Sequence, residues 1–563
     1  MRSNMILSLV FLLGCSESSP SAVDTTPDTL DTGADGTAVG DNGETPADTE
    51  TASDSGSDLL TVSDAPPNPA DVRDPSDTAI SGPLELPLTP QEIPVHIDWA
   101  LNGTPGLSGV LLQTGLATHN GDLFVTAYFS GTVSVGNLTI SADDTSYTHV
   151  LGVRVSPKGE VRYLRHLCDG CSGAAGEASD GRIALVSMSK TLVGNPTGPD
   201  LIDLTADEAG MAVTIISPDG YVETMRRFAV GPDATVRCVR ATQDGGWLVG
   251  GHFNELAFEN GTTYTVPEPV FWPGQGFIVK LTPNLKVDWV ELVKGTAASS
   301  VSMLAEWGAG FVAVGDFGGY PLGVVSEFGT SGVTLEALSS DDDPAMDIFI
   351  TRWSAPGDVL FARRVQHYSN GPRNPTWLDV EGDTLTTRVD SVAKLEVDDE
   401  LHYRGGYGES GVALSTRWDS VGTLVESVLL PYGANRVPMS PHYAVLSHSI
   451  PGDTITWGKE PNTLTFEIPK STGQQSYETL ISGLFHEDGA VGKAGVLGLS
   501  YRAGQVPPYI QAVSPQPDGT FLAVLYGSAS IVFEPEAETP TVLDNDGYER
   551  LIFAKIRLGE LGL

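Results

Sequence analysis

Two cysteines three positions apart are candidates for a metal site, a redox pair or a disulfide. Cys168 and Cys171 follow a predicted strand. A structural zinc site needs four ligands, and only His166 and the distant Cys238 are available to complete one. A redox pair with this spacing belongs at the start of a helix in a thioredoxin-like unit, which this segment is not. We therefore expect Cys168 and Cys171 to form a local disulfide, with zinc binding and redox chemistry as the alternatives.

An acidic loop near the C-terminus supplies a second set of candidate ligands. Asp544, Asp546 and Glu549 carry carboxylate oxygens, which are the ligands that calcium prefers. The loop resembles the opening of an EF-hand loop but lacks the glutamate at the spacing that completes one. The sequence is compatible with either a calcium site or a solvated acidic turn here, and we expect no other cofactor.

The motifs of common enzyme classes are missing from the sequence. It contains no Gly-x-Ser-x-Gly elbow, no His-Glu-x-x-His pair and no glycine loop of the kind that holds phosphate. Its ten histidines are scattered singly. We identify no catalytic residue, so the sequence favours a binding protein over an enzyme.

The N-terminus reads as a targeting segment. After the positive charge of Arg2, the apolar stretch from Met5 to Leu13 suits a signal peptide and is too short to span a bilayer. It ends in a Leu-Leu-Gly-Cys motif at Cys15, which resembles the lipobox of bacterial lipoproteins. That resemblance implies removal of residues 1–14 and acylation of Cys15 as a lipid anchor. An ordinary signal peptide with an incidental cysteine is the alternative.

The same resemblance carries an expected location. Several acyl chains on one residue give stable membrane attachment. Ser16, directly after Cys15, resembles the signal for outer-membrane sorting in Gram-negative bacteria. We expect a lipid-anchored protein of the bacterial outer membrane, on its periplasmic or its cell-surface face.

Residues 15–92 have the composition of a disordered linker. From Ser16 to Glu92 there are 17 acidic residues and a single basic one, Arg73, and no aromatic residue. A segment with so little apolar surface and so much unbalanced charge cannot offset the entropy lost on ordering. We interpret it as a spacer between the lipid and a folded domain.

The overall charge excludes two classes of direct partner. The chain has 72 acidic and 31 basic residues, for a net charge of −41. Nucleic-acid binding depends on Lys and Arg that neutralise phosphates, and docking on anionic lipid depends on a basic patch. We expect neither nucleic acid nor an anionic membrane surface as a direct ligand.

The rest of the chain is a degenerate repeat. An alternating apolar strand closed by a turn recurs seven times, at intervals of 61 to 72 residues. In most copies a glycine turn and an apolar strand precede it, and a further strand follows it. The closing turns end at Gly159, Gly220, Leu285, Gly357, Gly422, Gly489 and Gly559.

Four strands per unit and almost no helical periodicity predict an all-β protein. Repeated four-stranded antiparallel units are typical of a β-propeller, so residues 93–563 are predicted to form seven blades. Leu285 replaces glycine in the third copy, whose turn we expect to be the least regular. The last unit lacks its fourth strand. Residues 95–101 match the fourth strand at 287–290 in order and composition, so we expect them to complete the seventh blade and close the ring.

These units resemble the bacterial seven-bladed β-propeller repeat family of the SBBP type. In that family a glycine turn leads to a strand that ends in Gly-x-Phe, and an insertion and an Asp-x-Phe-x-x-Lys strand follow. The best matches are residues 250–253, 315–317 and 347–353. The resemblance implies the fold, and a secreted or surface-attached bacterial protein.

We therefore predict a monomeric lipoprotein whose propeller is a non-enzymatic binding or adhesion module for an unidentified protein or polysaccharide. Insertions between the second and third strands, such as residues 262–274 and 319–343, are the predicted contact surfaces. The alternatives are a carbohydrate-active propeller enzyme, a lyase or glycosidase, with or without calcium, and a structural envelope protein without a specific ligand.

Overall fold

A computed structural model describes residues 90–558, apart from intervals between strands. The intervals of six residues or more are 143–148, 267–273, 338–345, 368–374, 405–411, 468–474, 503–508, 534–540 and 544–549. The described residues form strands and turns and contain no helix. It follows that no helix in this part of the chain is long and apolar enough to cross a membrane.

The strands pair into seven sheets of four or more strands and one separate hairpin, numbered here by the order of their first strands. Sheet 1 contains β3 (Val110–Ala117), β4 (Leu123–Phe129), β7 (His149–Val155), β8 (Val161–Asp169), β11 (Val193–Gly194) and β12 (Ile202–Asp203). Sheet 2 contains β9 (Ala174–Glu177), β10 (Ile183–Ser189), β13 (Gly210–Ile216), β14 (Val222–Val230), β17 (Glu255–Phe258) and β18 (Thr263–Thr265). Sheet 3 contains β15 (Ala234–Ala241), β16 (Trp247–Phe253), β19 (Gln275–Leu281), β20 (Val287–Gly295), β23 (Val325–Phe328) and β24 (Val333–Glu336). Sheet 4 contains β21 (Ala298–Trp307), β22 (Gly310–Gly318), β25 (Met346–Ala355), β26 (Asp358–His367), β29 (Lys394–Val397) and β30 (Glu400–Arg404).

The remaining sheets come from the C-terminal half and the N-terminal strands. Sheet 5 contains β27 (Pro375–Glu381), β28 (Thr384–Ser391), β31 (Val412–Asp419) and β32 (Leu424–Pro431). The separate hairpin contains β35 (Thr454–Lys459) and β36 (Asn462–Glu467). Sheet 6 contains β33 (Asn435–Met439), β34 (His442–Ser449), β37 (Gln475–Phe485), β38 (Val491–Arg502), β41 (Ile531–Phe533) and β42 (Thr541–Leu543), with β1 (Gln91–Glu92) parallel to β38. Sheet 7 contains β39 (Tyr509–Pro515), β40 (Thr520–Gly527), β43 (Arg550–Leu558), β2 (Val95–Thr104), β5 (Thr132–Val135) and β6 (Leu138–Ser141).

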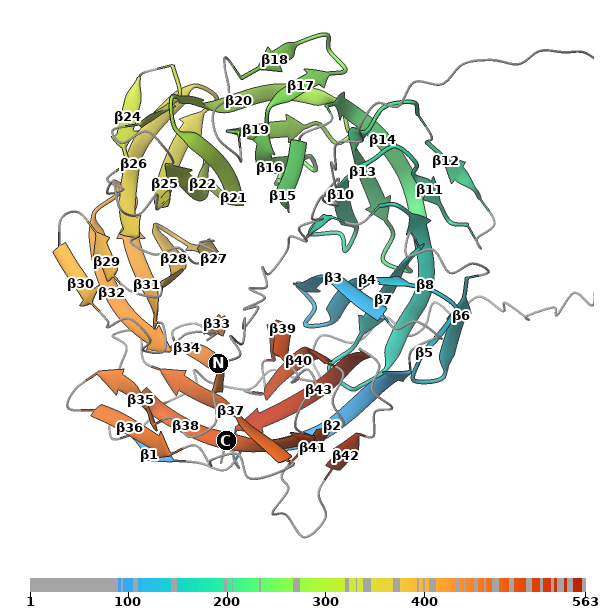
Figure 1. The fold of residues 1–563 in the computed structure, drawn as a ribbon, viewed down its shortest axis with the longest axis vertical. Helices are drawn as coiled ribbons and strands as arrows, with labels where there is room; N and C mark the ends of the chain where they lie inside the picture. Colours follow the sequence, from blue (N-terminus) through green and yellow to red (C-terminus); the bar gives the residue numbers. More distant parts are fainter. Residues whose placement is uncertain are drawn as a thin grey trace, which may run out of the picture. The chain divides into compact units, whose positions relative to one another are not determined.

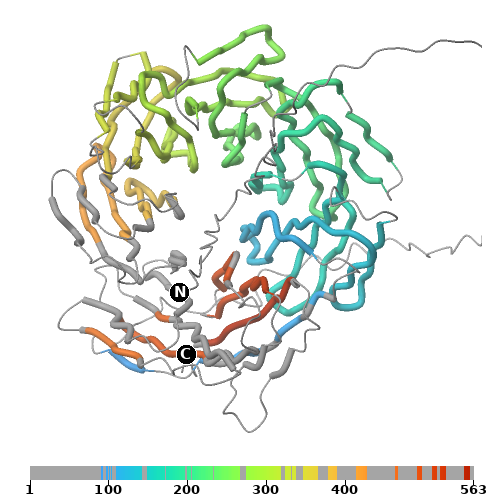
Figure 2. Tube along the Cα trace, in the orientation of Figure 1, coloured from blue at the N-terminus to red at the C-terminus, as the bar shows by residue number. Residues whose placement is uncertain are grey.

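The sheets follow one another around a propeller-like ring (Figures 1 and 2). Their first strands lie innermost and pack in sequence: β3 against β9, β9 against β15, β15 against β21, and β21 against β27. Further round, β33 packs against β39 and β39 against β3. Six sheets have six or seven strands in the described residues, and sheet 5 has four. The predicted count of seven blades therefore depends on sheet 5.

The second and third strands of the sheets are buried on both faces, which the alternating pattern did not predict. Every residue of β13, β16 and β19 is buried, because each sheet is covered by a neighbouring sheet on either side. Period-2 alternation of buried and exposed residues appears instead in the outer strands such as β5 and β23. Apolar residues therefore occur on both faces of these middle strands.

The two outermost strands of most sheets are supplied by the next unit along the chain. The hairpin β11–β12 lies in sequence between β10 and β13 of sheet 2, yet β11 pairs with β8 of sheet 1. In the same way β17 pairs with β14, β23 with β20, β29 with β26 and β41 with β38. The insertions predicted as ligand-contact surfaces thus contribute β18, β23 and β24 to the edges of preceding sheets.

The N-terminal strand completes the sheet that contains the C-terminal strand. Residues 95–102 of β2 run antiparallel to β43, from Val95 opposite Leu558 to Asn102 opposite Ile552. Beyond them, Gly103 and Thr104 pair with β5. One strand from the start of the domain therefore joins the last strand of the chain to the first insertion hairpin.

Among the described closing turns, those of the first, second, third and fifth units share one hydrogen-bond pattern. Gly159, Gly220, Gly357 and Gly422 have φ between 79° and 85°, a left-handed conformation that glycine adopts without strain. Leu285 takes the same place with φ 60°, and its N–H donates to the Thr282 carbonyl as Gly159 N–H does to that of Ser156. The expectation of an irregular third turn was wrong, because surrounding pairing holds Leu285 in the shape that glycine has elsewhere.

The glycine of the Gly-x-Phe signature is required by close packing of the inner strand. A Cβ at Gly251 would overlap the carbonyl oxygen of Thr235, and one at Gly315 would overlap that of Ser300. In both cases the inner strand bulges a few residues further along, as the register shifts in β15 and β21 show. The repeat signature therefore marks a close approach of two strands.

Candidate functional site

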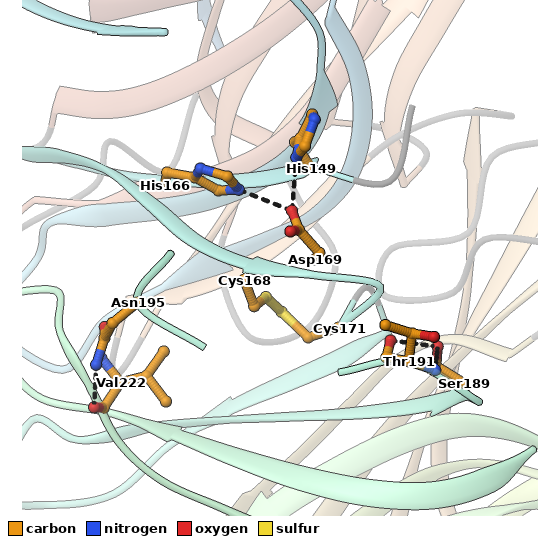
Figure 3. The surroundings of a disulfide bond; sticks show 9 residues. All are labelled: His149, His166, Cys168, Asp169, Cys171, Ser189, Thr191, Asn195 and Val222. Carbon is orange, nitrogen blue, oxygen red and sulfur yellow. Dashed lines mark hydrogen bonds and ion pairs between the residues drawn. A yellow bond between two sulfur atoms is a disulfide. The ribbon is translucent and has the colours of Figure 1, made fainter. Parts of the chain in front are cut away.

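Three metal-ligand side chains meet at the end of sheet 1 where β7 begins and β8 ends (Figure 3). His149 Nδ1 lies 2.6 Å and His166 Nε2 lies 2.9 Å from the same carboxylate oxygen, Asp169 Oδ1. The two imidazole rings are 5.0 Å apart edge to face, and both pack on Phe129. Within the described residues, this is the set of His, Cys, Asp or Glu side chains grouped closely enough to hold a metal ion.

Strand register brings these residues together. His149 and Asp169 are directly opposite each other in the β7–β8 hairpin. A register shift follows at Val150, so that Leu151 faces His166. This bulge places His166 near Asp169, which lies three positions further along the same strand.

The carboxylate of Asp169 is held in its ionised form. Partial burial raises its pKa, but hydrogen bonds from His166 and His149 outweigh burial, so the pKa lies below its usual value. The side chain of His166 is 5% exposed, that of His149 12% and that of Asp169 25%. Solvent therefore reaches the cluster from the side of His149 and Asp169.

A disulfide bond fixes the loop that contains Asp169. The structure links Cys168 to Cys171, with both side chains fully buried and the Cα atoms 5.9 Å apart. A thiolate zinc site built on this pair is incompatible with the bond. Cys238 lies on β15 in sheet 3 and is half-buried, with its thiol directed to the carbonyl of Val301 at 3.8 Å.

Comparison of equivalent positions shows that the cluster is particular to the first unit. The strand pairing places His149 opposite Phe129, and the same position holds Gln275 opposite Phe253 and Asp347 opposite Phe317. The position of His166 is taken by Arg227, Leu292 and Arg364 in the second, third and fourth units. In these four described units, the fold accepts very different side chains here.

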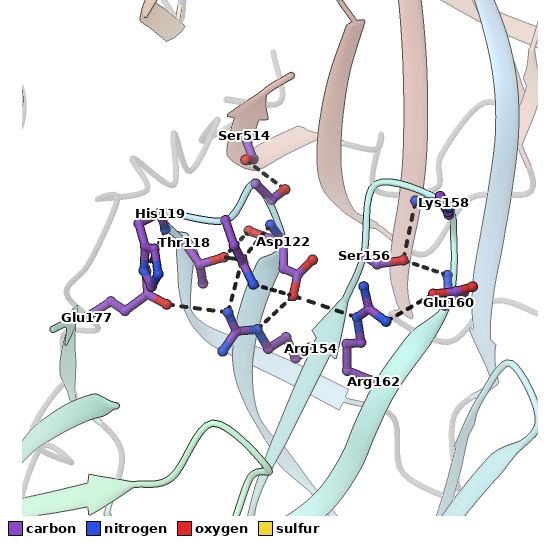
Figure 4. Close-up of polar contacts among 12 residues, drawn as sticks. Thr118, His119, Asp122, Arg154, Ser156, Lys158, Glu160, Arg162, Glu177 and Ser514 are labelled. Carbon is purple, nitrogen blue, oxygen red and sulfur yellow. Dashed lines mark hydrogen bonds and ion pairs between the residues drawn. The ribbon is translucent and has the colours of Figure 1, made fainter. Parts of the chain in front are cut away.

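The opposite end of the sheets carries a network that recurs. Arg154 is 4% exposed and lies 2.9 Å from Asp122 Oδ2 and 3.4 Å from Glu177 Oε1 of sheet 2 (Figure 4). The backbone N–H of His119 donates to Glu177 Oε2 at 2.6 Å. The carboxylate of Glu177 thus ties the first turn of sheet 1 to the next sheet.

A similar arrangement joins sheet 3 to sheet 4. Lys280 lies 2.7 Å from Asp244, and the backbone N–H of Gln243 donates to Glu306 of β21 at 2.8 Å. The hydrogen bond from Lys280 is the main reason that the pKa of Asp244 falls to about 2. Because the same arrangement occurs twice, we infer that the side chains at this end hold neighbouring sheets together.

The other sequence-predicted site residues lie outside the described part of the chain. They are Cys15, Asp544, Asp546 and Glu549. Among residues that are described, sequence reasoning named Cys168, Cys171 and His166 and missed His149 and the role of Asp169. They could have been found from the register of the β7–β8 hairpin. That register is obtained by pairing residues outward from the turn at Gly159 and allowing for the bulges in the hairpin.

Comparison with known proteins adds little to this geometry. No protein-family model matches the chain. No curated protein matches it. Among solved structures, the chain is similar to the extracellular domain of a protein described as a hybrid two-component system from B. thetaiotaomicron. The match has 9% identity, covers 83% of each chain and has a TM-score of 0.18.

Proposed function

We propose that the chain is a lipid-anchored propeller of the bacterial outer membrane that acts as a binding or adhesion module. The observation that carries the proposal is the difference between the two ends of the units. Side chains at one end recur and join neighbouring sheets, whereas those at the other end change from unit to unit. A rigid scaffold with one variable end is typical of proteins that recognise a ligand.

We also propose that the ring has seven blades. Sheet 5 has the same order of four antiparallel strands as the inner part of the other sheets. Its outer strand β32 contacts β35. In the other sheets the corresponding strand is paired with a hairpin from the following unit, and β35–β36 is that hairpin here. The hairpin β35–β36 then supplies the outer edge of sheet 5, as the other hairpins do in their sheets.

The anchor is tested by replacing its cysteine. We expect Cys15→Ser to move the chain out of the membrane fraction and to abolish incorporation of an alkyne analogue of palmitate, because no thiol remains to be acylated. Sucrose-gradient fractionation of a Gram-negative host and in-gel fluorescence measure the two effects. Cys238→Ser is the matched control and should fractionate and label as the unaltered chain does. A Cys15→Ser chain that still labels, or stays in the outer membrane, would refute the anchor.

Binding is tested with the Cys15→Ser chain on a polysaccharide array and on intact bacterial cells. We expect saturable retention on at least one of these surfaces with no change in the length of the glycan chains, which chromatography of the eluted material measures. Shortened glycans would instead indicate that the chain is a carbohydrate-active enzyme. Retention no greater than that of heat-unfolded chain on every surface would contradict both.

A further inference from the structure

We propose that His149, His166 and Asp169 bind a divalent first-row transition-metal ion of the zinc class. This site is independent of the proposed lipid anchor and ligand. It lies at the variable end of sheet 1 and is formed by the β7–β8 hairpin (Figure 3).

The geometry is within reach of metal coordination. Two imidazole nitrogens already converge on one carboxylate oxygen, at 2.6 and 2.9 Å. In a tetrahedral site with bonds of about 2.0–2.1 Å, neighbouring ligand atoms lie about 3.3 Å apart. Lengthening the two nitrogen–oxygen distances by less than about 1 Å brings both to this value, and all three ligand atoms already lie within 4.8 Å of one another.

The fold does not require these three side chains. In the other units the equivalent positions hold pairs such as Asp347 with Arg364, or Gln275 with Leu292, and the same hairpin forms around them. Among the four units compared, only the first has ligand-type residues at both positions. Since the fold tolerates unrelated residues there, we attribute the set to a function of that unit alone.

The site is held in place on two sides. Asp169 lies inside the four-residue loop closed by the Cys168–Cys171 disulfide, which limits the positions available to its carboxylate. His166 is buried, which limits the positions available to its ring.

The ligand set selects the class of ion. Two neutral imidazoles and one carboxylate suit zinc and its first-row neighbours, whereas calcium needs six to eight oxygen ligands. Three protein ligands leave at least one coordination position open, and the solvent-exposed side of His149 and Asp169 provides access to it.

Isothermal titration of the full-length chain with ZnCl₂ tests the site, without a histidine tag and under non-reducing conditions so that Cys168 and Cys171 stay bonded to each other and do not compete for zinc. We expect one zinc ion per chain and no heat from CaCl₂. His149→Ala and Asp169→Asn should each weaken zinc binding by more than the roughly 10–100-fold that loss of an outer-shell partner causes. Substitution with Co²⁺ should give visible absorption bands that both variants lose.

His119→Ala is the matched control. Its imidazole also lies beside a carboxylate, 3.1 Å from Glu177, but at the opposite end of sheet 1 and with no third ligand among the described residues. We expect this variant to bind zinc as the unaltered chain does. The proposal is overturned if the unaltered chain binds no zinc, or if His149→Ala and Asp169→Asn bind it normally. Circular dichroism of the metal-free variants shows whether each one folds. If His149→Ala does not fold, Asp169→Asn still tests the site, because asparagine has nearly the shape of aspartate.

Discussion

A chain that lacks residues 95–104 is expected to lose more stability than any single substitution removes. Without β2, the strand β43 loses a ladder of seven residue pairs and the hairpin β5–β6 loses its partner. Net backbone hydrogen-bond energies of about 0.5–1.5 kcal/mol each put the loss at several kcal/mol, before any apolar contacts are counted. Calorimetry should show a lower melting temperature, and limited proteolysis should cut first within 531–558.

A deletion of equal length in the linker is the matched control for this prediction. Removing residues 40–49 should leave the melting temperature unchanged, because the linker is expected to add no packed surface. A synthetic peptide of residues 93–105 should restore protease resistance to the chain without β2 by adding the missing strand. Equal melting temperatures for the two deletions would show that β2 does not close the ring.

Arg154→Met is expected to destabilise the protein by about 3–5 kcal/mol. The substitution removes the buried cation that lies between the carboxylates of Asp122 and Glu177, and breaking a buried ion pair by removal of one partner has a cost of this size. Urea unfolding followed by tryptophan fluorescence measures the change. Adding Asp122→Asn and Glu177→Gln to Arg154→Met should recover part of the loss, because the unpaired charges are then gone.

The exposed ion pair of the next sheet is the control for Arg154. Arg182 and Asp180 lie 2.8 Å apart, but their side chains are 36% and 52% exposed. Pairs of this kind contribute at most about 1 kcal/mol, so Arg182→Gln should have little effect. If Arg154→Met is as mild as Arg182→Gln, the buried network does not hold sheets 1 and 2 together.

Local patterns in the sequence were enough to find the strands, the turns and the disulfide. The seven signatures place the third strand of each unit correctly because alternation and turn residues are local properties. The pairing of 95–101 with β43 was accessible for a different reason: the last unit is one strand short and this segment matches a fourth strand.

Features that depend on pairing between distant strands were not accessible. The hairpin at 325–336 reads as an insertion of the fourth unit, and nothing in its alternation indicates that it pairs with β20 of the third. His149 was missed because its contact with Asp169 depends on the hairpin register, and that with His166 on a bulge. A shift of one residue reverses the side of the sheet on which every side chain lies, so such contacts need the pairing itself.

The exchange of outer hairpins between units has a consequence for synthesis and export. A sheet cannot be finished when its own four strands have emerged, since its edge arrives only with β11–β12 or the corresponding hairpin of the following unit. Sheet 7 must wait longest, because β2 is made before the strands of every other sheet except β1, and its partner β43 is made after them. Until then the first and last segments have unpaired edges, which are prone to wrong association. A chain of this design therefore has most need of chaperone protection at β2 and at the strands of sheet 7 that wait for it.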